Sequence, residues 1–340
     1  MPLRPRMLAV SIAFSLFPPP LAAALAATPA DELQVVAEIP GSDASFDYAA
    51  IDPVARLLYV ARGDGVMTVD LTDMKVTPIR VPGSKVAAVL PLPDGRLLST
   101  NGTSNTATLS DGRSGLRIAE IPTGKDPDAA AYDRKTGLVF VMDAADGDTT
   151  LIDPATGAVA GHVPIGGALE GAVADGAGRL YINIEDKAEV AVLDTTQRRV
   201  VARYPLPGCS KPAGLGFDPE SRVLLSVCRN QKALALHAEN GRVAAILGID
   251  RIPDAVIFDG SRKMFFVPCA RDATMIAIAT NGGKPSVVRK IPTAIGARTG
   301  ALDPETGKIY LPAADYDIDP TGFTQKPGTF RVLVVGARRS

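Results

Sequence analysis

One turn signature recurs along the whole chain at near-constant spacing, and it restricts the fold more than any other feature of the sequence. Each occurrence is an apolar pair followed by Asp, a short turn and a β-rich run. The positions are Asp52, Leu92 (in place of Asp), Asp133, Asp175, Asp218, Asp259 and Asp303. Successive positions are 40, 41, 42, 43, 41 and 44 residues apart. Four-stranded propeller blades repeat at about 40–45 residues, so the chain is predicted to be an all-β protein, a seven-bladed β-propeller.

Each repeat unit also has the pattern of four short strands, A to D. In the fifth unit the expected strands cover residues 213–217, 222–229, 233–238 and 242–249. Several units end on an apolar residue and Pro, which suits an outer edge strand because a missing N–H costs little there. No segment after residue 26 has a long helical period, which excludes an α/β fold.

The two ends of the chain complement each other. The seventh unit reaches a third strand at 330–336 and lacks a fourth. Residues 33–40 supply it, because Ala37-Glu38-Ile39-Pro40 repeats the motif Ala119-Glu120-Ile121-Pro122 that ends another unit. We therefore expect the N-terminal strand to complete the last blade and close the ring, which removes two free sheet edges.

The N-terminal segment has the features of a secretory signal peptide over residues 1–26. Arg4 and Arg6 precede a short apolar run, and Ala24-Leu25-Ala26 is a plausible cleavage motif. A retained anchor helix is the alternative, which the three prolines at 18–20 disfavour. The propeller at 27–340 is therefore expected to be periplasmic and monomeric, with no membrane span.

The net charge bears on nucleic-acid binding, and the cysteine content bears on disulfide formation. The formal net charge is −1, which gives no support to nucleic-acid binding. The three cysteines are an odd number, so one thiol stays free in an oxidising compartment. Cys209 and Cys228 fall on the same face of the fifth unit and are predicted to form a disulfide. Cys269, one blade later, is expected to be the free thiol.

Several segments resemble the bacterial YncE-like propellers, which are built from YVTN-type repeats of about 40 residues. They lie at 180–190, 207–215, 227–230 and 330–336, and the resemblance extends over essentially the whole mature chain. It implies a propeller fold and brings no catalytic motif. The wider set of similar propellers includes periplasmic quinoprotein and copper-enzyme subunits. DNA binding has been proposed for members of the family, but the neutral charge does not support it here.

The candidate site follows from the repeat. In a propeller the D–A connections and the B–C loops lie on one face, around the central channel, and loops on a rigid frame commonly bind ligands. The candidate ligand-binding residues in these segments are Asp47, Arg62, Asp128, Asp143, Glu170, Asn183, Glu185, Arg229, Asp254, Arg271 and Arg298. Lys85 and Lys211 occur in the same D–A connections.

Two functions are compatible with such a polar face. The first is non-catalytic binding of a small polar ligand or a periplasmic protein. The second is a metal-assisted hydrolase, lactonase or lyase at the channel, with Ca²⁺ or Mg²⁺ held by oxygen ligands from Glu170, Asp128, Asn183 and Asp254. His162 and His237 are expected at outer positions of the repeat, which disfavours a histidine-based lyase or a Ser-His-Asp hydrolase. The loop at 314–329, with its alternating carboxylates, is expected to be a solvated flap.

Overall fold

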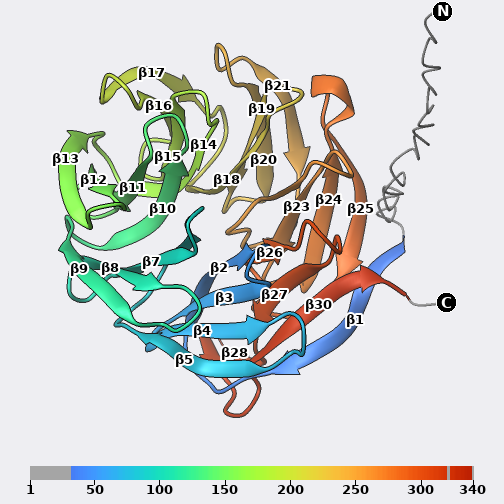
Figure 1. Cartoon of the computed structure of the whole chain (residues 1–340). Helices are drawn as coiled ribbons and strands as arrows, with labels where there is room; N and C mark the ends of the chain where they lie inside the picture. Colours follow the sequence, from blue (N-terminus) through green and yellow to red (C-terminus); the bar gives the residue numbers. More distant parts are fainter. Residues whose placement is uncertain (1–31, 320–321, 339–340) are drawn as a thin grey trace, which may run out of the picture.

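The computed structural model describes residues 32–319 and 322–338, so the predicted signal peptide at 1–26 lies outside the described residues. Seven four-stranded antiparallel sheets are arranged in a ring, with strand A of each blade at the centre (Figure 1). The all-β, seven-bladed prediction is confirmed. Among the described residues, no helix is long and apolar enough to cross a membrane.

Blades 1 to 4 follow the chain in order, from the inner strand to the outer one. Blade 1 contains β2 (Phe46–Asp52), β3 (Leu57–Arg62), β4 (Gly65–Asp70) and β5 (Val76–Pro82). Blade 2 contains β6 (Val89–Pro91), β7 (Arg96–Asn101), β8 (Thr106–Asp111) and β9 (Arg117–Pro122). Blade 3 contains β10 (Pro127–Asp133), β11 (Leu138–Asp143), β12 (Asp148–Asp153) and β13 (Ala158–Pro164). Blade 4 contains β14 (Leu169–Ala174), β15 (Arg179–Ile184), β16 (Glu189–Asp194) and β17 (Arg199–Pro205).

Blades 5 and 6 have the same order, and blade 7 joins the two ends of the chain. Blade 5 contains β18 (Pro212–Asp218), β19 (Val223–Cys228), β20 (Lys232–His237) and β21 (Val243–Gly248). Blade 6 contains β22 (Ile257–Asp259), β23 (Met264–Cys269), β24 (Thr274–Ala279), the short 3₁₀ turn η2 (Asn281–Gly283) and β25 (Ser286–Pro292). Blade 7 contains β26 (Ala301–Leu302), β27 (Ile309–Ala313), β30 (Arg331–Ala337) and β1 (Leu33–Pro40).

The predicted ring closure is confirmed. The first strand β1 pairs antiparallel with the last strand β30, from Leu33 opposite Ala337 to Pro40 opposite Arg331. Figure 1 shows the blue β1 lying along the red β30. Leu33 and Ile39 of β1 are buried, so the closing strand is packed as well as hydrogen-bonded.

The recurring Asp of the repeat has a structural role, because it caps the turn that follows strand A. Asp52 Oδ1 accepts the backbone N–H groups of Val54 and Ala55, both at 2.9 Å. The other five accept the N–H two residues further on; they are Asp133, Asp175, Asp218, Asp259 and Asp303. Asp commonly caps such turns, which explains why it recurs at this position in every blade except the second, where Leu92 replaces it.

Neighbouring blades pack face to face and form the core between them. All six residues of β3 are buried. Phe266 of blade 6 and Leu311 of blade 7 are fully buried in one shared cluster. Each fully buried side chain of this size contributes about 1.5–3 kcal/mol relative to an exposed one.

The loop at 314–329, expected to be a solvated flap, contains a hairpin. It forms a β-hairpin of β28 (Tyr316–Asp319) and β29 (Gly322–Gln325). Tyr316 packs against the core cluster between blades 7 and 1, which anchors the hairpin. Asp317 remains exposed and pairs with Lys326 at 3.1 Å.

Candidate functional site

Each blade contributes one equivalent residue, which lies five positions before the turn residue of the repeat. These seven residues surround the channel on one face. This mouth ring consists of Asp47, Ala87, Asp128, Glu170, Ala213, Asp254 and Arg298. Five of the seven positions are charged, and four of those five are carboxylates. The blade repeat therefore brings residues far apart in the sequence to one place.

Irregular pairing of strand A displays these side chains. The strand register shifts between Phe46 and Ala49 in β2, between Pro127 and Ala129 in β10, and between Leu169 and Ala172 in β14. The residues inside the shifts include Asp47, Asp128 and Glu170. Such bulges bend a strand locally and re-aim its side chains, often beside functional sites.

These side chains enclose a cavity of about 200 Å³, which we call the mouth cavity. It is lined by Asp47, Tyr48, Asp128, Glu170, Arg229, Ile252, Asp254 and Arg298. Six of the eleven residues selected from the sequence thus meet at one cavity. Tyr48 and Ile252 were not selected, although each is within two residues of a mouth-ring carboxylate.

Two guanidinium groups lie among the four carboxylates. Arg298 Nε is 2.9 Å from Asp254 Oδ2, and its Nη2 is 3.6 Å from Asp47 Oδ2. Arg229 Nη2 is 3.8 Å from Glu170 Oε1 and 3.7 Å from Asp254 Oδ1. Asp128 has no ion pair and no side-chain hydrogen bond to any other residue in the described ranges. The cavity therefore contains more carboxylates than cationic partners.

Burial is the main cause of the raised pKa values in this cluster. The pKa is raised to about 7 for Asp47, about 6 for Asp128 and about 8 for Glu170. Neighbouring carboxylates contribute to these rises, while Arg298 opposes the rise at Asp47 and Arg229 opposes it at Glu170. The cluster therefore holds protons near neutral pH, and a bound cation would favour release of those protons.

The side chains that line the channel below the mouth are mostly apolar. A cavity of about 350 Å³, the channel cavity, is lined by residues of strand A and of the segments just before it. They include Ala88, Ala130, Ala172, Gly214, Leu215, Ala255, Val256 and Gly300, and Tyr48 lines both cavities. A Cβ atom added to Gly171 would lie 2.6 Å from Ala213 O, so glycine allows β14 and β18 to approach closely.

Arg62 and Asp143, both predicted at the channel face, are buried and do not line the mouth cavity. Arg62 is 1% exposed, donates to Ser42 O at 2.7 Å and lies over the Phe330 ring. Asp143 is fully buried and accepts a hydrogen bond from Thr150 Oγ1 at 2.6 Å. Each is the last residue of its strand B, so its side chain points between blades rather than into the cavity.

Asn183 also has a structural position that the sequence did not reveal. Its Nδ2 donates to Ala213 O at 2.8 Å and Gly214 O at 3.0 Å, and its Oδ1 accepts from Ser226 Oγ at 2.9 Å. The two carbonyl groups lie inside the register shift of β18. Asn183 therefore satisfies backbone groups that the bulge removes from the sheet.

The remaining candidates lie at the rim of the face. Glu185 Oε1 is 3.8 Å from Arg229 Nε and 3.4 Å from Lys211 Nζ, so it borders the mouth cavity without lining it. Arg271 lies outside the cavity, where its backbone N–H donates to Arg251 O. Lys85 is exposed and pairs with Asp126.

The carboxylates do not fit the Ca²⁺ or Mg²⁺ site considered from the sequence. In the described ranges, no group of three or more His, Cys, Asp or Glu side chains converges as a ligand set. Arg229 and Arg298 contact three of the four carboxylates instead. Asn183, one of the suggested ligands, is bonded to backbone carbonyls. The histidines have the expected positions, since His162 is on β13 and His237 ends β20, outside both cavities.

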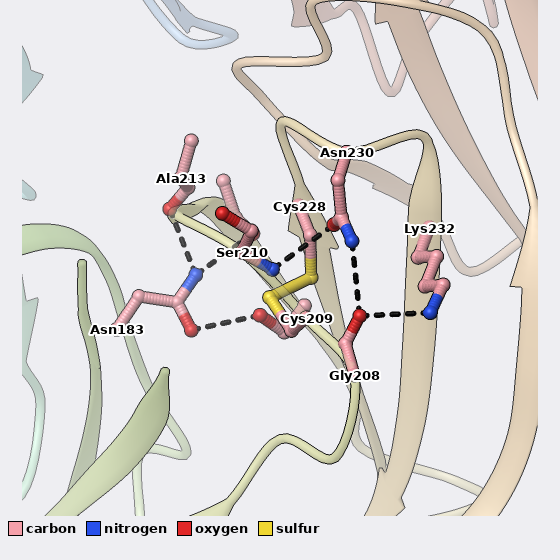
Figure 2. The surroundings of a disulfide bond; sticks show 10 residues. Asn183, Gly208, Cys209, Ser210, Ala213, Cys228, Asn230 and Lys232 are labelled. Atoms are coloured by element: carbon pink, nitrogen blue, oxygen red, sulfur yellow. Dashed lines mark hydrogen bonds between the residues drawn. A yellow bond between two sulfur atoms is a disulfide. The ribbon is translucent and has the colours of Figure 1, made fainter. Parts of the chain in front are cut away.

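The predicted disulfide is confirmed on the same face. Cys209 and Cys228 are bonded, with their Cα atoms 5.6 Å apart, and Cys269 is free and buried. Figure 2 shows the bond between the loop before β18 and the end of β19. Burial raises the pKa of the Cys269 thiol to about 12, so this thiol is unreactive at neutral pH.

Comparison with solved structures identifies the fold. A chain of Kuenenia stuttgartiensis hydrazine synthase is 17% identical, with a TM-score of 0.68 over 80% of this chain and 93% of that one. A chain of the mitotic checkpoint complex is 12% identical, with a TM-score of 0.72 over 98% and 99%. U3-55K is 11% identical, with a TM-score of 0.74 over 90% and 99%.

At such low identity these likenesses demonstrate a shared β-propeller fold and nothing about activity. No protein-family model matches the chain, and no curated protein sequence matches it. Any function must therefore be argued from the site.

Proposed function

We propose that this chain is an exported, periplasmic propeller of the YVTN-repeat type that binds a small polar ligand at the mouth cavity and does not transform it. The ligand we propose carries a protonated amine. Four carboxylates and two guanidinium groups line the cavity, so a cationic group on the ligand would balance the excess negative charge.

The observation that carries this proposal is the unpaired state of Asp128 among the described residues. Asp254, Asp47 and Glu170 each have a guanidinium partner, whereas Asp128 has none. A partly buried carboxylate without a partner is costly, because desolvation is not repaid. An ammonium group beside Asp128 would supply the missing charge and hydrogen bonds.

The size of the cavity limits the ligand. About 200 Å³ is less than the roughly 300–1,000 Å³ of pockets for drug-sized molecules, so the polar part of the ligand is small. The apolar channel cavity adjoins it through Tyr48. A short hydrocarbon stem on the ligand can extend from the mouth into the channel.

Export is supported by the N-terminal signal pattern and by the Cys209–Cys228 disulfide, since such bonds persist in oxidising compartments. Metal-assisted chemistry is not proposed, because the donor groups in the described ranges do not converge.

The test is an NMR chemical-shift titration with three probes of similar size, butylammonium, butanol and butyrate. We expect butylammonium to bind, with shifts in residues around Asp128, and butyrate not to bind. Asp128→Asn should weaken butylammonium binding about tenfold or more, because hydrogen bonds to charged groups contribute about 1.5–3 kcal/mol.

Asp126→Asn is the matched control. Asp126 is also an aspartate, two residues before Asp128 in the sequence, and lies outside the cavity, and Asn tolerates its positive φ of 53°. An equal loss of affinity in both variants would show non-specific attraction to negative charge. Preferential binding of butyrate would contradict the proposal outright.

A further inference from the structure

Two positions can be compared at the point in each blade where the D–A loop passes the end of strand B. One lies four residues before the mouth ring and the other is the last residue of strand B. The pairs in blades 1 to 7 are Asp43 and Arg62, Gly83 and Asn101, Gly124 and Asp143, Gly166 and Ile184, Cys209 and Cys228, Asp250 and Cys269, and Ala294 and Ala313. A Cβ atom on Gly124 would lie 2.7 Å from Asp143 Cγ, so the two positions are in close contact in blade 3. Only blade 5 joins the two covalently.

The next residue along the chain is the one that can reach the mouth cavity. In blades 1 to 7 this position is Gly63, Gly102, Ala144, Glu185, Arg229, Ala270 and Ala314. Among these seven, Arg229 is the one that lines the cavity. The covalent pair therefore occurs in the same blade as the guanidinium that enters the site.

Blade 6 provides an internal comparison. Cys269 is the equivalent of Cys228, and Asp250 is the equivalent of Cys209. Cys269 is buried and unbridged, and the residue after it is Ala270. Blade 6 therefore has neither a side chain in the mouth cavity nor a crosslink at this position.

The loop around the disulfide is also held by side chains, as Figure 2 shows. Asn230 Oδ1 accepts the backbone N–H of Ser210 at 3.0 Å, and Asn230 Nδ2 donates to Gly208 O at 3.0 Å. Lys232 Nζ donates to the same carbonyl at 2.8 Å. The residues on both sides of Arg229 are therefore fixed to the D–A loop.

The Arg229 side chain itself is held only loosely. Its contacts with Glu170, Glu185 and Asp254 are between 3.7 and 3.8 Å, longer than normal hydrogen bonds, and its side chain is 44% exposed. Long side chains lose substantial conformational entropy on ordering. Its location in the mouth must then depend on where its backbone is anchored.

We infer that the Cys209–Cys228 disulfide positions Arg229 in the mouth cavity and so sets the charge balance of that site. The inference goes beyond the proposed function, because it concerns the ionisation of the mouth cavity when no ligand is bound. With the crosslink removed, the B–C turn of blade 5 is joined to the D–A loop by hydrogen bonds such as that from the Arg229 backbone N–H to Lys211 O at 3.1 Å, and the guanidinium loses its fixed position beside Glu170 and Asp254.

The test follows the ionisation of Glu170 by ¹³C NMR of the carboxyl group, with no ligand present. Arg229 opposes the rise in the pKa of Glu170, so Arg229→Gln should raise this pKa by about one unit. We expect Cys209→Ala with Cys228→Ala, which copies the pair of blade 7, to raise it by most of that amount. Reduction of the folded wild-type protein should do the same.

Cys209→Gly with Cys228→Asn copies the contacting pair of blade 2, Gly83 and Asn101, and guards against a variant that does not fold. Cys269→Ser is the control and should leave the pKa of Glu170 unchanged. An unchanged pKa in the folded, disulfide-free protein, with a raised pKa in Arg229→Gln, would overturn the inference. Unfolding of every disulfide-free form would also overturn it, because the bond would then serve stability alone. Neither result would affect the amine-binding proposal, which is tested separately.

Discussion

At the scale of single residues, burial and the repulsion between like charges disfavour ionisation of the carboxylates in the mouth cavity. Four carboxylates share a small space, and Asp128 forms no ion pair with any of the described residues. Folding therefore stabilises the protonated forms of these groups. Because ionising these groups in the folded protein costs free energy, the free energy of unfolding depends on pH.

Glu170 gives the clearest prediction. Its ordinary pKa is 4.5, and the folded protein raises that pKa to about 8. The folded state therefore binds more protons than the unfolded state between these pH values, and the free energy of unfolding falls as pH rises from about 4.5 through about 8. In Glu170→Gln this fall should be smaller by about 1–3 kcal/mol, because coupling to neighbouring charges reduces the full effect.

Urea unfolding at pH 5 and pH 8.5 measures this difference. Glu185→Gln is the control, because Glu185 borders the same cavity and makes ion pairs at the rim. Parallel loss of stability in wild type and Glu170→Gln would show that Glu170 ionises normally.

The sequence located some of these residues and misplaced others for a geometric reason. Asp47, Asp128, Glu170, Asp254 and Arg298 could be found because the D–A connections recur with the blade. Successive side chains of a strand point to opposite faces, so an error of one residue at the end of strand B reverses the direction of a side chain.

Arg62 and Asp143 illustrate that error. Each is the last residue of strand B, and the residue after it is Gly63 or Ala144. Tyr48 was missed for a related reason, because the register shift of β2 adds a residue to strand A that no spacing rule anticipates.

At the scale of elements, the inner strands of blades 4 and 5 are in close contact. The carbonyl oxygen of Ala213 lies 2.6 Å from the position that a Cβ on Gly171 would occupy. The strands β14 and β18 are therefore held at a separation that only glycine permits.

Gly171→Ala should destabilise the propeller by about 1–3 kcal/mol, because the added methyl group forces two backbones apart. Thermal unfolding followed by circular dichroism measures the change. Gly248→Ala is the control, since nothing lies within 4 Å of a Cβ there and its φ is not positive. If both variants unfold at the same temperature, the channel strands are more adaptable than the structure indicates.

At the scale of the whole molecule, the fold was predictable in detail because one periodicity specifies it. The blade number, the ring closure and the boundaries of β1 all followed from the spacing of the repeat. The hairpin of β28 and β29 did not, because it occurs once and has no equivalent in the other blades.

Removal of β1 should open the ring. A chain beginning at Gly41 exposes the edge of β30 and loses the buried side chains of Leu33 and Ile39. We expect loss of several kcal/mol of stability, at about 1.5–3 kcal/mol for each side chain, together with aggregation through the free edge. Size-exclusion chromatography and thermal unfolding measure both effects, with a chain beginning at Glu32 as the control. A monomeric protein of unchanged stability would show that blade 7 is complete without β1.

The pairing of β1 with β30 also determines the order of events during folding. Leu33 pairs with Ala337 near the other end of the chain, so β1 has no partner strand until the six intervening blades have formed. Contacts between distant parts of a chain are slow to form, because the loop between them must be ordered first. Ring closure is therefore expected to be the late step of folding, and a partner that captures β1 beforehand would keep the propeller open.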